Sequence, residues 1–133
     1  MRNVANILKE SQTIAVFGLS AKEERASHAI AKYLLHAGYT IIPVNPGQRE
    51  ILGQKCYKSL EEIPNDIQID IVNVFRKSED TPPIAQSTVA IGAKCLWLQL
   101  GIQNSESRDI AVKAGLDYIE NKCIKIEHSN ANM

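Results

Sequence analysis

The stretch SHAIAKYLLHAGYTIIPV, residues 27–44, contains the helix, glycine and strand pattern that determines the predicted fold. Its first part places Ile30, Leu34 and other apolar residues three and four positions apart, which predicts an amphipathic helix. Gly38 follows, and glycine readily adopts the left-handed conformation that ends many helices. The apolar run at 39–44 is typical of a buried strand in a parallel sheet.

Similar apolar segments recur along the chain, separated by segments with helical spacing. The predicted strands are Thr13–Phe17, Tyr39–Val44, Ile69–Phe75, Ala93–Leu98 and Leu116–Ile119. Strands that alternate with helices pair in parallel through right-handed crossovers. We therefore predict an α/β fold: a Rossmann-like, doubly wound, five-stranded parallel sheet with helices on both faces. With the strands numbered along the chain, we expect the order 3-2-1-4-5.

Length and composition limit the class of protein. The chain has 133 residues, of which 44% are hydrophobic, and 15 basic residues balance 15 acidic ones. We expect one domain over residues 1–133, with its core at about 12–128. Because the net charge is zero and no apolar run is long enough for a bilayer, we expect neither a nucleic-acid partner nor a membrane. No signal peptide is visible, which favours a cytoplasmic location.

The cysteine pattern favours a reducing compartment. Cys56, Cys95 and Cys123 are widely spaced, odd in number and without a C-x-x-C pair. Their separation from one another and from the histidines gives no support for a zinc site, so no metal is expected.

Ligands of doubly wound sheets bind at the carboxyl ends of the strands, which directs attention to the residues there. After the first predicted strand, Gly18 permits a tight turn and a close approach of a ligand to the backbone. Ser20 offers a hydroxyl group, Lys22 offers a cation, and the start of the next helix attracts anions. The chain lacks the G-x-G-x-x-G fingerprint there, so Gly18 on its own is equally consistent with an ordinary turn.

The ends of the next two strands narrow the choice of nucleotide. An NAD site normally has an acidic residue after the second strand, where this chain has Asn45 and Pro46. Their presence disfavours binding of NAD and permits binding of a nucleotide with a phosphorylated ribose, such as coenzyme A or NADP. After the third strand, Phe75 could pack beside a base and Arg76 could pair with a phosphate. The alternative is a core phenylalanine and a solvated arginine.

Trp97 lies within the fourth strand, where we expect burial, and Gln99 and Gly101 after it are candidates for lining a groove. The last segment, 121–128, is interpreted as packing over the pocket and supplying a cation. Cys123 and His128 could be imagined as nucleophile and base, but their spacing does not place them on one face. Two alternatives to simple binding stay open: a thiol redox or CoA-disulfide protein that uses Cys123, and an NAD(P)-binding oxidoreductase-like domain. His28, near the expected anion site, is a further candidate.

Five blocks, in this order, resemble the small stand-alone CoA-binding proteins, a family similar to the N-terminal CoA-binding domain of the succinyl-CoA synthetase alpha subunit. They are Gly18–Ser20, Val44–Pro46, Val74–Arg76, Trp97–Gly101 and Asn121–His128. The resemblance runs from about Ile14 to His128.

The resemblance implies that CoA or an acyl-CoA lies across the strand ends. The residues that it implies are Gly18, Leu19, Ser20, Ala21, Lys22, Arg25, Ser27, Asn45, Pro46, Val74, Phe75, Arg76, Gln99, Leu100, Gly101 and Lys125.

Ala21 and Ala26 stand where members of this family often carry prolines. The chain has no counterpart of the synthetase's second domain or phosphohistidine loop, so the resemblance implies binding without catalytic machinery. Trp97 or the N-terminal helix could support a homodimer, or the chain could signal to another protein partner.

Overall fold

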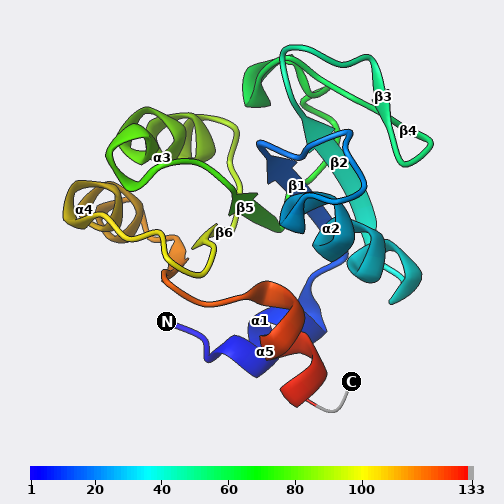
Figure 1. Ribbon diagram of the computed structural model, residues 1–133. Coiled ribbons are helices and arrows are strands. Elements are labelled where there is room, and N and C mark those ends of the chain that lie inside the picture. The colour runs from blue at the N-terminus through cyan, green and yellow to red at the C-terminus, as the bar shows by residue number, and fades with distance from the viewer. Residues whose placement is uncertain (132–133) are drawn as a thin grey trace.

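Five buried segments form a parallel sheet in the computed structural model, which describes residues 1–131 of the chain (Figure 1). The strands, in spatial order, are β2 (Thr40–Val44), β1 (Thr13–Phe17), β5 (Ile71–Val74), β6 (Cys95–Leu98) and β7 (Asp117–Ile119). Every neighbouring pair runs parallel, and the predicted strand segments are confirmed: the first has the predicted bounds, and each of the others is one to three residues shorter than predicted. Asn132 and Met133, the last residues of the expected domain, lie outside the described residues.

The connections between the strands are mainly helical. The α-helices are α1 (Val4–Glu10), α2 (Ala26–His36), α3 (Thr81–Ala90), α4 (Ser105–Lys113) and α5 (Ile124–Asn130). Between β2 and β5 lie a small hairpin, β3 (Glu50–Ile51) with β4 (Gln54–Lys55), and the short 3₁₀ helix η1 (Leu60–Glu62). A second 3₁₀ helix, η2 (Ser78–Asp80), leads into α3, whose first turn contains Pro82 and Pro83. Proline fits there because the first amides of a helix have no partner within it.

Side chains of the sheet alternate between two cores. Ile14 and Val16 of β1 pack with α1, α2 and α5, whereas Ala15 between them packs on the side of α3 and α4. Figure 1 shows these two groups of helices on opposite sides of the sheet. The predicted Rossmann-like α/β class is confirmed. Trp97 is fully buried, as expected, and its Nε1 donates a hydrogen bond to the Lys122 carbonyl oxygen at 2.8 Å.

The predicted strand order puts one strand, β5, in the wrong position. Counted along the chain, the order is 2-1-3-4-5 and not 3-2-1-4-5, because β5 pairs with β1 instead of lying outside β2. On the outer side of β2, Tyr57 forms an isolated parallel bridge to Val44. All four residues of β5 are buried, which suits an interior strand better than an edge strand.

Asp70 explains why β5 begins beside β1. Its Oδ2 accepts hydrogen bonds from the backbone N–H groups of Gln12 and Thr13 at 2.8 and 2.9 Å. The Asp70 N–H in turn donates to the Thr13 carbonyl oxygen at 2.9 Å. The side chain therefore joins the start of β5 to the start of β1, an interaction that apolar periodicity cannot reveal.

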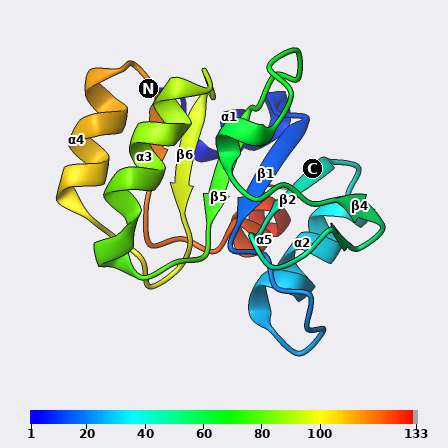
Figure 2. The ribbon, with the colours of Figure 1, turned by 90° about the horizontal axis from the view of Figure 1, so that it is seen from above.

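The corrected order still places a ligand site at the ends of β1 and β5. The chain leaves β1 toward β2 on one side and later returns to β5 on the other, so the topological switch point lies between β1 and β5. Figure 2 shows the arrowheads of β5 and β6 pointing to the sheet edge that carries the loop between β1 and α2.

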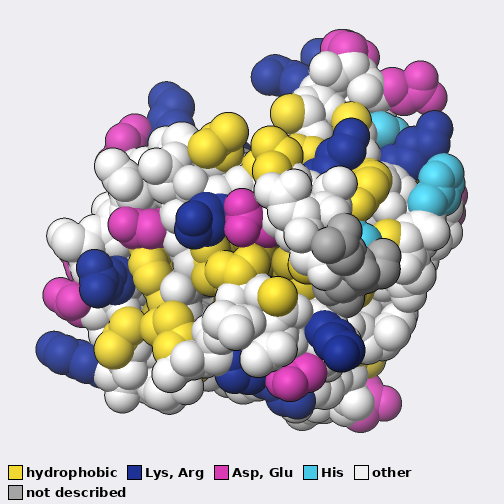
Figure 3. All heavy atoms as spheres, turned by 90° about the horizontal axis from the view of Figure 1, so that it is seen from below, with side chains coloured by type: hydrophobic (Ala, Val, Ile, Leu, Met, Phe, Trp, Pro, Cys, Tyr) yellow, Lys and Arg dark blue, Asp and Glu magenta, His cyan; other side chains and the backbone are white. Residues whose placement is uncertain are grey.

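The face that carries α1 and α5 is chemically mixed. Figure 3 shows hydrophobic side chains there interrupted by charged and polar ones. No helix within residues 1–131 has the combination of length and apolar character that crossing a membrane requires.

Asp70→Ala should lower the free energy of unfolding by about 2–4 kcal/mol, because two backbone N–H groups lose a charged acceptor. Urea unfolding followed by Trp97 fluorescence measures the loss. Lys94→Ala is the control, since Lys94 is exposed and its Nζ lies 3.7 Å from Asp70 Oδ1, a pair worth about 1 kcal/mol at most. Equal losses in the two variants would show that the carboxylate does not hold β5 to β1.

Candidate functional site

The turn after β1 lies tightly against the end of β5. Gly18 has a φ of +86°, and a Cβ placed there would lie 2.5 Å from the Phe75 carbonyl oxygen. The same Cβ would lie 3.5 Å from Arg76 Nε, so the guanidinium group of Arg76 is next to this turn. Gly18 is therefore required by the backbone itself, and its position brings Arg76 to the start of the loop at 18–25.

Side chains from α2 and β2 hold this loop in place. Ser27 Oγ accepts a hydrogen bond from the Ser20 N–H at 3.0 Å, and His28 Nδ1 lies 2.9 Å from the Ser20 carbonyl oxygen. Asn45 Nδ2 donates to the Leu19 carbonyl oxygen at 2.9 Å. The loop is thus fixed before any ligand binds. Ser27, His28 and Asn45 use these polar atoms to support it.

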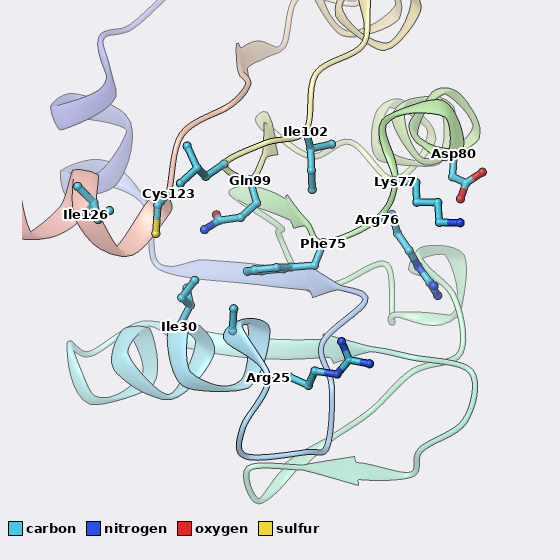
Figure 4. A pocket seen from close by; sticks show the side chains of 12 residues that line it. Arg25, Ile30, Phe75, Arg76, Lys77, Asp80, Gln99, Ile102, Cys123 and Ile126 are labelled. Atoms are coloured by element: carbon cyan, nitrogen blue, oxygen red, sulfur yellow. The ribbon is translucent and has the colours of Figure 1, made fainter.

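A cavity of about 740 Å³ opens beside the loop, at the carboxyl ends of β5 and β6 and between α2 and α5 (Figure 4). Its lining consists of Arg25, Ala26, Ile30, Phe75, Arg76, Lys77, Asp80, Gln99, Leu100, Ile102, Cys123 and Ile126. The cavity therefore occupies the switch point, where the fold directs ligands.

The two ends of the cavity differ in chemistry. Arg25, Arg76 and Lys77 lie toward one end in Figure 4, together with the acidic Asp80. The opposite end has Ile30, Cys123 and Ile126. The first turn of α2, beside Arg25, contains no acidic residue and no side-chain cap, so its free N–H groups add to the positive potential. The cavity thus has a cationic end and a mainly apolar end that carries a thiol.

Gln99 supplies a polar group between these ends. Its side chain is only 5% exposed, and its Oε1 accepts hydrogen bonds from Asn73 Nδ2 at 3.3 Å and from the Ile124 N–H at 3.2 Å. These two donors fix the orientation of the amide. Within residues 1–131 the structure records no partner for Gln99 Nε2, so a hydrogen-bond donor remains available in the cavity wall (Figure 4).

The cavity brings together six of the residues singled out from the sequence: Arg25, Phe75, Arg76, Gln99, Leu100 and Cys123. The others do not line it. Leu19 and Val74 are fully buried core residues, and Lys125 Nζ lies 5.3 Å from the centre of the Tyr33 ring. The remaining residues lie in the loop, at its α2 support, in the turn after β2 or just after β6: Gly18, Ser20, Ala21, Lys22, Ser27, Asn45, Pro46 and Gly101.

Cys123 and His128 do not form a pair. His128 Nδ1 lies 2.8 Å from Tyr33 Oη, and its ring also meets the Tyr39 ring edge-on. Cys123 lies in the cavity instead. Among residues 1–131, no group of three or more His, Cys, Asp and Glu side chains is arranged to hold a metal ion.

The other six lining residues were not selected from the sequence as site residues: Ala26, Ile30, Lys77, Asp80, Ile102 and Ile126. Ile126 follows Cys123 by three positions, which places both on one side once α5 is recognised as a helix. The segment was interpreted only as packing over the pocket, with no helix assigned to it, so this shared side was not recognised. Lys77 directly follows Arg76, so the pair of adjacent basic residues could have identified Lys77 as a further site residue.

Comparison with known proteins identifies the family. The sequence model of the CoA-binding domain family matches residues 12–129, nearly the whole chain. The chain belongs to the CoA-binding domain family. This confirms the family that the five sequence blocks indicated.

The relatives include both small and large proteins. YneT of Bacillus subtilis (strain 168) is 44% identical over 126 residues, which cover 95% of this chain and 92% of that protein. A hypothetical protein from Pyrococcus horikoshii OT3 has a structure with a TM-score of 0.93 and 37% identity, over 98% of this chain and 90% of that one. The alpha subunit of acetate–CoA ligase [ADP-forming] II of Pyrococcus furiosus is 28% identical over 90% of this chain, which aligns with 28% of the subunit.

Gly18→Ala should destabilise the protein more than Gly115→Ala. Both glycines have similar φ, +86° and +82°, so both substitutions carry the left-handed backbone penalty of about 1–2 kcal/mol. A Cβ at Gly18 also meets the Phe75 carbonyl oxygen, whereas one at Gly115 meets nothing within 4 Å. Urea unfolding should show an additional loss of about 1–3 kcal/mol for Gly18→Ala. Similar losses would contradict the close approach of the turn to β5.

Proposed function

We propose that this protein binds coenzyme A or an acyl-CoA in the cavity at the carboxyl ends of β5 and β6. The observation that carries the proposal is the polarity of that cavity, which is cationic at one end and mainly apolar at the other. CoA has the same polarity, because it carries phosphates at one end and an uncharged arm with a thiol at the other. Membership of the CoA-binding domain family supports this ligand, as does the name of the related acetate–CoA ligase subunit.

The phosphates belong at the cationic end. Arg25 and Arg76 offer planar guanidinium groups that can each donate two hydrogen bonds to one phosphate. The uncapped first turn of α2 adds backbone N–H donors. Lys22, exposed in the adjacent loop, adds a further cation near the nucleotide. In this arrangement the nucleotide lies against the loop at 18–25 and the turn at Asn45 and Pro46.

The pantetheine arm belongs along Phe75, Gln99 and Leu100. The arm contains two amides, and Gln99 Nε2 is a donor in the cavity wall suited to one of their carbonyl oxygens. Leu100 is 60% exposed at the rim and Ile126 is 51% exposed at the thiol-bearing end. These apolar side chains would lose contact with water when the arm, or an acyl group attached to it, covers them.

A dinucleotide fits the same edge less well. Asn45 stands where NAD sites place an acid for the ribose hydroxyls, and both polar atoms of its side chain are already used. Its Nδ2 donates to the Leu19 carbonyl oxygen, and its Oδ1 accepts from the Gly47 N–H at 2.8 Å. The proposal therefore assigns binding of CoA in preference to NAD, and it assigns no reaction.

Calorimetric titration under reducing conditions should show that CoA binds more tightly than NADP or NAD, and that its affinity falls as salt is added. Arg76→Ala should weaken CoA binding about tenfold or more, since it removes a charge-assisted hydrogen bond to phosphate. Arg49→Ala is the matched control, because Arg49 is an exposed arginine beside the β3–β4 hairpin and outside this cavity. Tighter binding of either dinucleotide, or equal effects of the two substitutions, would contradict the proposal.

A further inference from the structure

The three cysteines, all free, have different surroundings. Cys95 is fully buried in β6, and burial strongly raises the pKa of its thiol. Cys56 is buried as well; its Sγ donates to the Asn45 carbonyl oxygen at 3.4 Å, and burial raises its pKa. Cys123 is partly exposed and lines the cavity. Thiolates, not thiols, attack disulfides, so the surroundings of the first two suppress their reaction and those of Cys123 leave it accessible.

A second observation shows that the part of the cavity around Cys123 is suited to a ligand. Gln99 and Cys123 line the same cavity, and the Ile124 N–H, immediately after Cys123, donates to Gln99 Oε1. This bond joins the start of α5 to the amide whose Nε2 has no partner within residues 1–131. Gln99 is only 5% exposed but lines the cavity, so its Nε2 faces open space, where the carbonyl oxygen of a bound amide would accept its hydrogen bond. The donor and the thiol therefore lie in one ligand subsite.

The direction of the bound ligand follows from the charges. Figure 4 shows Arg76 and Cys123 at opposite ends of the cavity. When the phosphates of CoA lie at Arg25 and Arg76, the arm runs past Gln99 toward Cys123 and Ile126. The sulfur of the ligand then approaches the sulfur of the protein.

We propose that Cys123 forms a reversible mixed disulfide with coenzyme A by thiol–disulfide exchange with CoA disulfide, an inference that rests on the proposed CoA binding. The Cys123 thiol loses its proton to solvent, and the thiolate attacks one sulfur of CoA disulfide. A bond forms between Cys123 Sγ and that sulfur while the original disulfide bond breaks. The second CoA leaves with the electron pair as a thiolate and takes up a proton. The oxidant is the CoA disulfide itself, and a free thiol reverses the reaction.

The test treats the full chain with CoA disulfide, or with 2-hydroxyethyl disulfide as a small neutral disulfide, and follows adducts by intact-mass and peptide mass spectrometry. We expect one CoA per chain, on Cys123, removed by dithiothreitol and absent from Cys123→Ser. The rate should saturate with CoA disulfide and exceed the rate with the neutral disulfide about tenfold or more, because binding places the two sulfurs together. Arg76→Ala should slow only the reaction with CoA disulfide. Arg49→Ala should slow neither reaction.

The outcomes separate this inference from the proposed function. If reduced CoA binds by calorimetry but Cys123 gains no CoA, the disulfide inference is overturned and CoA binding stands. If CoA does not bind, both fail. Modification of Cys56 or Cys95 in preference to Cys123 also overturns the inference. Equal and unsaturated rates with the two disulfides overturn it as well, because they would show that Cys123 reacts only as an accessible thiol and not with a ligand bound in the cavity.

Discussion

The contact between the Gly18 turn and the Phe75 carbonyl oxygen is the constraint on which the site depends. The backbones of β1 and β5 meet here so closely that even a methyl group would lie 2.5 Å from that oxygen. Because nothing larger than hydrogen fits, the chain turns immediately after β1 and begins α2 beside the end of β5. Arg25, just before α2, and Arg76, just after β5, consequently reach the same end of one cavity. A structural requirement of the backbone thus creates the cationic end.

Buried amides fix the polar group between the two ends of the cavity. Asn73 is fully buried and donates to Gln99, while its Oδ1 has no partner among the described residues. Such an acceptor lowers stability, and an apolar residue in β5 would avoid the loss. What Asn73 does provide is a fixed orientation for Gln99, which the Ile124 N–H reinforces. The amide pair therefore links β5, β6 and the start of α5, and it aims a donor into the cavity.

Apolar periodicity and helix-ending glycines were sufficient to predict the strands of the parallel sheet and the helical segments between them, but not α5. They could not place β5, because its position depends on the Asp70 carboxylate, which binds backbone groups 57 and 58 residues away in the sequence. The rule for ligand sites identified Phe75, Arg76 and Gln99 because it needs only the strand ends, whereas Arg25 came from the family resemblance. It could not separate residues that line the cavity from those that support the loop. Asn45 and Ser27 look like ligand residues in the sequence, and only their hydrogen bonds show that they hold the loop.

That distinction also supports the proposed preference for coenzyme A over a dinucleotide. In a dinucleotide site, the residue after the second strand is free to take the ribose hydroxyls. Here Asn45 occupies that place, and its amide closes the loop onto Leu19 while its oxygen holds the turn at Gly47. Releasing Asn45 for a ribose would break the support of the loop, so recognition must come from elsewhere. The groups left to contact a ligand include two guanidinium groups, the Lys77 ammonium group, an uncapped helix start, one amide donor and a thiol, and the proposed ligand, a nucleotide with a long thiol-ended arm, would use all of them.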